Sequence, residues 1–127
     1  MPFLKGLAMS SYNHLDVSEN GDVTTVRFKR DQLLVDESVV RNIGSELDKL
    51  ATGQDRRKLI IDSFGVEDIS SLMLGQLVRL RTKMAAKKGQ LVLCGVSPEV
   101  REFFDETMLS QLFEIRETEA DAFAALA

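Results

Sequence analysis

Three acidic residues are the side chains of this sequence best placed for acid–base chemistry. Asp62 ends a short apolar run, and Glu67 and Asp68 follow it closely. General acid–base pairs in α/β proteins often lie at such strand ends. A catalytic set needs further convergent groups, and the sequence offers no nucleophile or metal ligand beside these three. We therefore interpret them as solvated loop charges. A small enzyme using Asp62 or Asp68 is the competing hypothesis.

The only histidine, His14, and the only cysteine, Cys94, lie far apart in the sequence. Zinc sites need several such ligands, so we expect no metal centre. No Gly-x-Ser-x-Gly motif is present to place His14 in a triad, and we expect His14 at the surface. Cys94 stands in an apolar run without a neighbouring base, which predicts a buried, unreactive thiol. With no glycine-rich phosphate loop either, we expect no catalytic residues and no cofactor.

The composition indicates one folded, acidic domain. The chain has 127 residues and is 44% hydrophobic and 28% charged, close to the average of globular proteins. A net charge of -4 and a pI near 5.0 argue against a nucleic-acid partner, because binding to phosphate backbones needs clustered Lys and Arg. No apolar stretch of about 18 residues occurs, so we expect no membrane span. A single cysteine forms no internal disulfide, which favours a reducing, cytoplasmic location.

Hydrophobic periodicity predicts a hairpin followed by alternating helices and strands. Residues 1–11 show no period and are expected to form a loose N-terminal arm, with the domain spanning 12–127. Turn residues at 20–22 lie between two apolar stretches and predict an antiparallel hairpin. A short strand at 33–35 could follow. The remaining elements are expected to be helices at 37–50, 71–87, 98 onward and 118–126, and strands at 58–62, 91–94 and 112–115. This alternation predicts an α/β domain with a largely parallel sheet.

The segment from Leu59 to Ile115 carries family-specific stretches in a characteristic order. The most specific read Val-Ser-Pro-Glu-Val-Arg at 96–101 and Leu-Phe-Glu-Ile at 112–115. In this respect the chain resembles the STAS domain family, which includes the anti-sigma factor antagonists. The resemblance implies a single α/β domain with a mixed, mostly parallel sheet of about four or five strands and about four helices, largely on one side of it.

The resemblance also assigns a candidate phosphoacceptor. In phosphorylated members the loop before the second helix reads hydrophobic-Asp-Ser-Ser/Thr-Gly-Leu-Gly, with the first Ser of the pair as acceptor. This chain reads Ile-Ser-Ser-Leu-Met-Leu-Gly at 69–75, which places Ser71 on the acceptor position. Ser70 replaces the Asp, Leu72 the following hydroxyl residue and Met73 the first Gly. Ser70 remains the alternative acceptor.

Helix-terminus physics gives this loop two interpretations. A serine at a strand-to-helix junction can accept a phosphate, because unpaired N–H groups and the positive end of the helix dipole lie there. Alternatively, Ser70 and Ser71 are only N-cap residues. Leu72 and Met73 either belong to the buried face of the helix or include an outward apolar contact, because the apolar run at 72–74 covers more than one helix face. The buried face is the usual place for Leu and Met at helical spacing, and Met73 is the candidate contact if one of these side chains points outward.

The resemblance implies a regulatory protein-binding module and not an enzyme. Its partner would be an anti-sigma factor or a regulatory serine kinase, which supplies the ATP and is released on phosphorylation. The implied partner-binding residues are Ser70, Ser71, Leu72, Met73 and Gly75. The alternative is an unphosphorylated scaffold or subunit of a sensory or lipid-transport assembly, in which Ser71 is only structural. Both hypotheses are compatible with a homo-oligomer.

Overall fold

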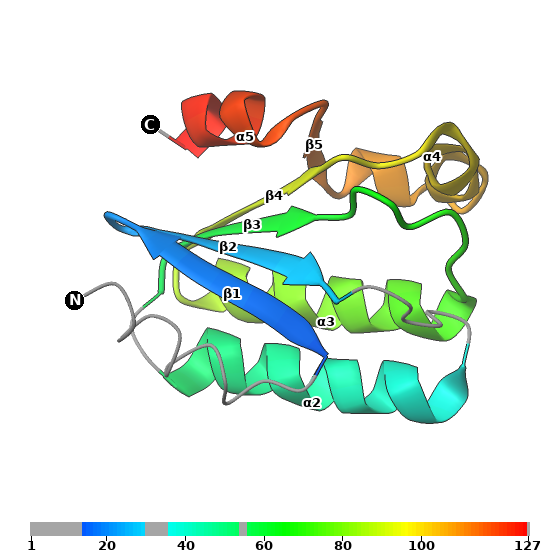
Figure 1. Cartoon of the computed structure of the whole chain (residues 1–127), viewed down its shortest axis with the longest axis horizontal. Coiled ribbons are helices and arrows are strands. Elements are labelled where there is room, and N and C mark those ends of the chain that lie inside the picture. Colours follow the sequence, from blue (N-terminus) through cyan, green and yellow to red (C-terminus); the bar gives the residue numbers. More distant parts are fainter. Residues whose placement is uncertain (1–13, 30–35, 54–55, 127) are drawn as a thin grey trace.

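A five-stranded mixed sheet is the centre of the fold (Figure 1). The computed structural model describes residues 14–29, 36–53 and 56–126. The expected arm at 1–11 and the expected strand at 33–35 lie outside these residues. The strands are β1 (Leu15–Asn20), β2 (Val23–Phe28), β3 (Lys58–Asp62), β4 (Gln90–Cys94) and β5 (Glu114–Arg116). The helices are α2 (Glu37–Gly53), α3 (Ser71–Ala86), α4 (Pro98–Glu106) and α5 (Glu119–Leu126), with a 3-10 turn η1 (Leu109–Gln111).

The sheet order is β1-β2-β3-β4-β5, which confirms the predicted mostly parallel topology. The hairpin of β1 and β2 is antiparallel, and each following pair of neighbouring strands is parallel. Gly21 in the hairpin turn has a φ of 64°, a conformation that glycine adopts without steric conflict. The parallel strands therefore end at one edge of the sheet, and the loops that leave this edge lead into α3 and α4.

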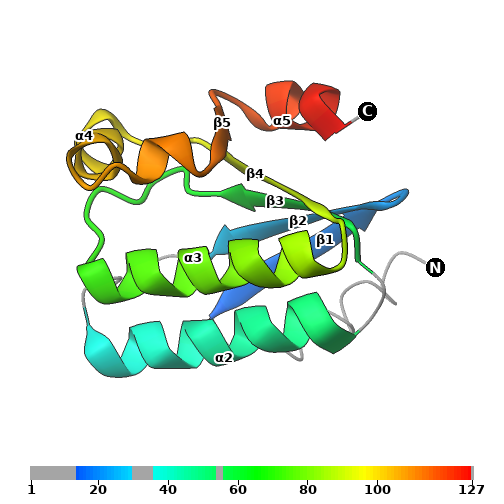
Figure 2. The same ribbon diagram turned by 180° about the vertical axis from the view of Figure 1, so that it is seen from behind.

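Helices cover both faces of the sheet, because β3 and β4 are apolar on both sides. Leu59 and Ile61 of β3 belong to the main core under α2 and α3, whereas Ile60 packs in a smaller cluster with Ala122 and Leu126 of α5. Figures 1 and 2 show α2 and α3 side by side on one face and α5 on the other. The helices were expected to lie largely on one side of the sheet, and α5 is the exception.

The third predicted helix begins as the sequence indicated. Ser97 is the N-cap of α4, its Oγ accepts a hydrogen bond of 3.2 Å from the Val100 N–H, and Pro98 occupies the first turn. The last strand begins later than expected, at Glu114 instead of residue 112. The physical reason is that Phe113 turns inward to pack against Phe104, with ring centroids 5.7 Å apart, before the strand pairs with β4.

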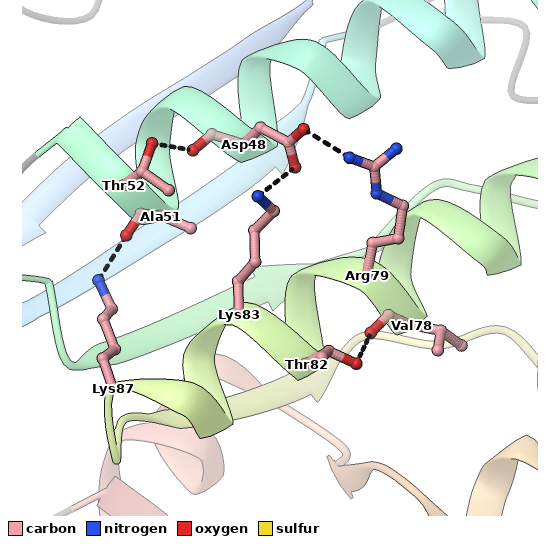
Figure 3. Close-up of polar contacts among 8 residues, drawn as sticks. All are labelled: Asp48, Ala51, Thr52, Val78, Arg79, Thr82, Lys83 and Lys87. Atoms are coloured by element: carbon pink, nitrogen blue, oxygen red, sulfur yellow. Dashed lines mark hydrogen bonds and ion pairs between the residues drawn. The ribbon is translucent and has the colours of Figure 1, made fainter.

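Polar contacts join α2 to α3 along their exposed side (Figure 3). Asp48 of α2 accepts a 3.0 Å contact from Arg79 and lies 3.8 Å from the ammonium of Lys83. At the other end of the pair, Lys87 Nζ donates a 2.6 Å hydrogen bond to the carbonyl of Ala51, near the C-terminus of α2. These contacts supplement the apolar packing between the two helices.

Candidate functional site at the start of α3

The loop between β3 and α3 is held by hydrogen bonds to the end of the sheet. The Ser63 N–H donates to the carbonyl of Cys94 at 2.9 Å, and the Val66 N–H donates to the carbonyl of Ser63 at 2.9 Å. Asp62 Oδ1 accepts from the Phe64 N–H at 2.9 Å. Gly65 has a φ of 89°, which lets the chain turn sharply after Phe64. These contacts hold the first half of the loop, which leads on to the first turn of α3, in one conformation.

The two serines at the start of α3 have different roles. Ser70 is the N-cap, in an extended conformation, and its Oγ accepts a 3.2 Å hydrogen bond from the Met73 N–H. Ser71 is the first residue of the helix and is exposed, and its hydroxyl forms no hydrogen bond with the described residues. The N-cap interpretation is therefore confirmed for Ser70 and not for Ser71. Ser70 caps the helix, and Ser71 presents a hydroxyl to solvent.

The first turn of α3 can accommodate an anion. Its backbone N–H groups lie at the positive end of the helix dipole, and among the described residues only the Met73 and Leu74 N–H groups have hydrogen-bond partners, both on Ser70. No acidic side chain occupies this turn. A phosphate on Ser71 would thus meet a favourable field without displacing a carboxylate.

The structure excludes Met73 as an outward contact and confirms the buried-face interpretation for this residue. Its side chain is fully buried, in the main core with Leu74, Leu77, Leu80 and Met84. These residues recur at helical spacing and form the stripe of α3 that faces the sheet and α2. Leu72 is half-buried and packs against the edge of the same core. Gly75 is exposed, and a methyl group added there would meet no atom of the described residues within 4 Å, apart from the neighbouring backbone of its own helix.

The exposed apolar residue on the connection to α3 is instead Phe64, which was not among the predicted contact residues. Its side chain is 87% exposed, the largest value among the big apolar residues that the structure describes. Helical periodicity could not identify it, because it lies in a loop. The available sequence signal was an aromatic residue between Ser63 and Gly65, two residue types typical of turns.

The three acidic residues that end β3 and follow it lie in different environments. Glu67 and Asp68 are exposed on the loop, whereas Asp62 is buried and lies 3.5 Å from the Nε of Arg27. Arg27 also pairs with Glu119 at the start of α5. A hydrogen bond with Asp62 and partial burial raise the pKa of Glu119, against the opposing charge of Arg27. This cluster joins β2, β3 and α5.

Cys94 is a buried thiol and not a reactive one. Burial, together with the nearby charges of Asp62 and Glu119, raises the pKa of the Cys94 thiol to about 12. The thiol therefore stays protonated at neutral pH, and Cys94 is fully buried as predicted.

His14 is half-buried, and its backbone N–H donates to Glu46 at 3.0 Å. Across residues 14–29, 36–53 and 56–126, no three His, Cys, Asp or Glu side chains converge as metal ligands. Within the same ranges no helix is both long and apolar enough to span a membrane.

Comparison with known proteins identifies the family. The STAS domain model matches residues 14–122, and the chain belongs to this family. Among solved structures, an anti-sigma-factor antagonist (STAS) domain protein from Planctomyces limnophilus has a TM-score of 0.79 and 28% identity, covering 88% of this chain and 97% of that chain. An anti-sigma factor antagonist from Mycobacterium paratuberculosis has a TM-score of 0.76 and 20% identity, covering 88% and 92%. The Bacillus cell fate determinant SpoIIAA, in its phosphorylated form, has a TM-score of 0.63 and 17% identity, covering 89% and 99%. Curated protein sequences gave no match. The fold is thus that of the anti-sigma factor antagonists.

Proposed function

We propose that this protein is a phosphorylation-switched binding module, which docks an anti-sigma factor or regulatory serine kinase through the start of α3. The observation that carries the proposal is the exposed Ser71 hydroxyl at the first position of α3, beside a Ser70 hydroxyl already used in capping. The contact surface comprises Ser71, the exposed Gly75 and the exposed edge of Leu72, with Ser70 holding the turn in place.

Phosphorylation of Ser71 would change the surface without refolding the protein. The kinase transfers the terminal phosphoryl group of ATP to Ser71 Oγ, the hydroxyl proton is released, and ADP leaves. The product gains about -1.5 to -2 charges at neutral pH, at a helix terminus that tolerates them. A partner that fitted a neutral hydroxyl would then have to desolvate that charge, which weakens the complex. The solved phosphorylated form of SpoIIAA supports the proposal, because it shows that this fold accommodates a phosphate.

The test uses the full chain with each purified serine-kinase anti-sigma factor encoded in the same genome, with and without Mg-ATP. Wild-type protein should bind one kinase, gain the mass of one phosphate on intact-mass measurement, and then dissociate. Ser71→Ala should bind and gain no phosphate. Ser71→Asp should fold normally and bind more weakly. Phosphate gain lost in Ser70→Ala but kept in Ser71→Ala would move the acceptor to Ser70.

Gly75 offers a probe of the docking surface that leaves the fold intact. A side-chain methyl at this position has open space around it, and alanine is the better helix former by about 1 kcal/mol. Gly75→Ala should therefore melt at the same or a higher temperature, yet weaken kinase binding if the partner approaches the helix backbone closely.

An unphosphorylated scaffold is the second candidate, and the departures from the family motif favour it. Ser70, Leu72 and Met73 replace the Asp, hydroxyl and Gly residues of the phosphorylated pattern, and Met73 is committed to the core. A scaffold would gain no phosphate from any kinase of the panel. It would also bind its partner equally well as wild type and as Ser71→Asp.

A further inference from the structure

Phe64 is an exposed aromatic residue on the loop that leads from β3 to Ser71. Three apolar side chains of large size are exposed among the described residues, namely Phe64 at 87%, Met108 at 61% and Leu112 at 41%. Only Phe64 lies on the β3–α3 loop, and it is also the most exposed of the three. An aromatic ring is the side chain that gains most from burial in an interface.

The backbone of Phe64 is fixed, so the ring is presented without a large ordering penalty. Its N–H donates to Asp62 Oδ1 at 2.9 Å, and the other carboxylate oxygen of Asp62 faces Arg27 at 3.5 Å. From the neighbouring strand end, a methyl group added to Gly95 would lie 2.9 Å from the Phe64 nitrogen, so the two backbones are nearly in contact. A rigid backbone lowers the entropy lost when a partner closes over the side chain.

Phe64 and Ser71 are close enough to lie under one partner. Seven residues of fully extended chain reach at most about 25 Å. A standard interface of about 800 Å² per partner measures about 30 Å across. Both residues lie on the stretch of chain that joins β3 to the start of α3, and this stretch leaves the sheet where β3 ends (Figure 1). An interface centred on this loop would therefore cover both.

The charge between Phe64 and Ser71 defines the chemistry of the partner. Glu67 and Asp68 are exposed on the connecting loop, and the segment from Ser63 to Ser70 contains no basic residue. A complementary surface would place Lys or Arg opposite these two carboxylates. In the proposed switch, phosphate on Ser71 weakens the complex. Basic residues of the partner that faced Ser71 would strengthen it instead, so we expect an uncharged partner surface opposite Ser71 and basic residues opposite Glu67 and Asp68.

We propose that Phe64 is the anchor residue of the docking surface, inserted into an apolar pocket of the partner kinase whose rim is basic and receives Glu67 and Asp68. This proposal rests on the proposed function and assigns the partner chemistry of the same site. It replaces Met73 by Phe64 as the apolar contact. Phosphorylation of Ser71 would then act at the edge of an interface centred on Phe64.

The experiment compares Phe64→Ser with Met108→Ser, a matched loss of an exposed apolar side chain outside the loop. Both variants should melt within a degree or two of wild type, because neither side chain is in the core. Using the purified kinase that binds wild type, Phe64→Ser should raise Kd by about 30-fold or more, and Met108→Ser should change Kd by less than about threefold. The double variant Glu67→Gln, Asp68→Asn should lower the association rate and reduce its dependence on salt.

Three outcomes would overturn the anchor assignment. Equal kinase affinity of Phe64→Ser and wild type, with phosphate gain intact, would refute the anchor and leave the proposed function standing. A wild-type dimer in analytical ultracentrifugation that dissociates in Phe64→Ser, with kinase affinity unchanged, would assign Phe64 to contact with a second copy of this chain. Failure of wild type to bind any kinase of the panel would refute both proposals together.

Discussion

At the scale of single residues, burial separates side chains that look equivalent in the sequence. Leu72, Met73 and Leu74 are three consecutive apolar residues, and the rotation of α3 places Met73 in the core and Leu72 at its edge. Phe64 is more apolar than its surroundings and yet faces water. The apolar character of a residue therefore did not determine its role here, and its position relative to the sheet did.

Met73 provides a stability test of this placement. Met73→Ala should lower the free energy of unfolding by about 2–5 kcal/mol, because it leaves a cavity among core residues of α3. Leu72→Ala, at a half-buried position next to it, should have a smaller effect. Urea unfolding followed by circular dichroism measures both. A Met73→Ala protein as stable as wild type would contradict the core position of this side chain.

At the scale of elements, the two adjacent serines at the start of α3 have different roles, because Ser70 caps the helix and Ser71 is exposed to solvent. Ser70→Ala removes the acceptor of the Met73 N–H and should destabilise the protein by about 1 kcal/mol. Ser71→Ala removes an exposed hydroxyl that has no hydrogen-bond partner in the described part of the chain, and it should be nearly neutral, within about 0.5 kcal/mol. Thermal melts of the matched pair measure the difference. A larger loss in Ser71→Ala would mean that Ser71, and not Ser70, caps the helix.

At the scale of the whole molecule, Arg27, Asp62 and Glu119 fasten α5 to the second face of the sheet. The pKa of Glu119 is raised, chiefly by its hydrogen bond to Asp62, so the folded state holds a proton that the unfolded state has already lost. This contribution to stability is complete below the ordinary Glu pKa of 4.5 and is lost as the pH rises through the raised value. The neighbours Arg27 and Cys94 stay in one protonation state over this range, because the Arg27 pKa is raised and the Cys94 pKa is about 12.

Glu119→Gln tests this linkage, because glutamine keeps a donor to Asp62 at every pH. Urea unfolding between about pH 4 and pH 7 should show less loss of stability with rising pH in Glu119→Gln than in wild type. Glu117→Gln, at an exposed position two residues earlier, is the control and should follow the wild-type profile. Identical profiles for Glu119→Gln and wild type would show that the pair between Glu119 and Asp62 carries no proton.

Local sequence patterns determined those parts of the protein that depend on neighbouring residues alone. The Ser97-Pro98 start of α4, the hairpin and the position of Ser71 at the beginning of α3 follow from capping, turn and period signals that act over a few residues. The class of fold followed from the alternation of strands and helices. Tertiary structure alone decided which face each residue presents. It buried Met73, exposed Phe64, and paired Asp62 with Arg27 and Glu119 across three elements, because such contacts depend on how helices and strands far apart in the chain pack together.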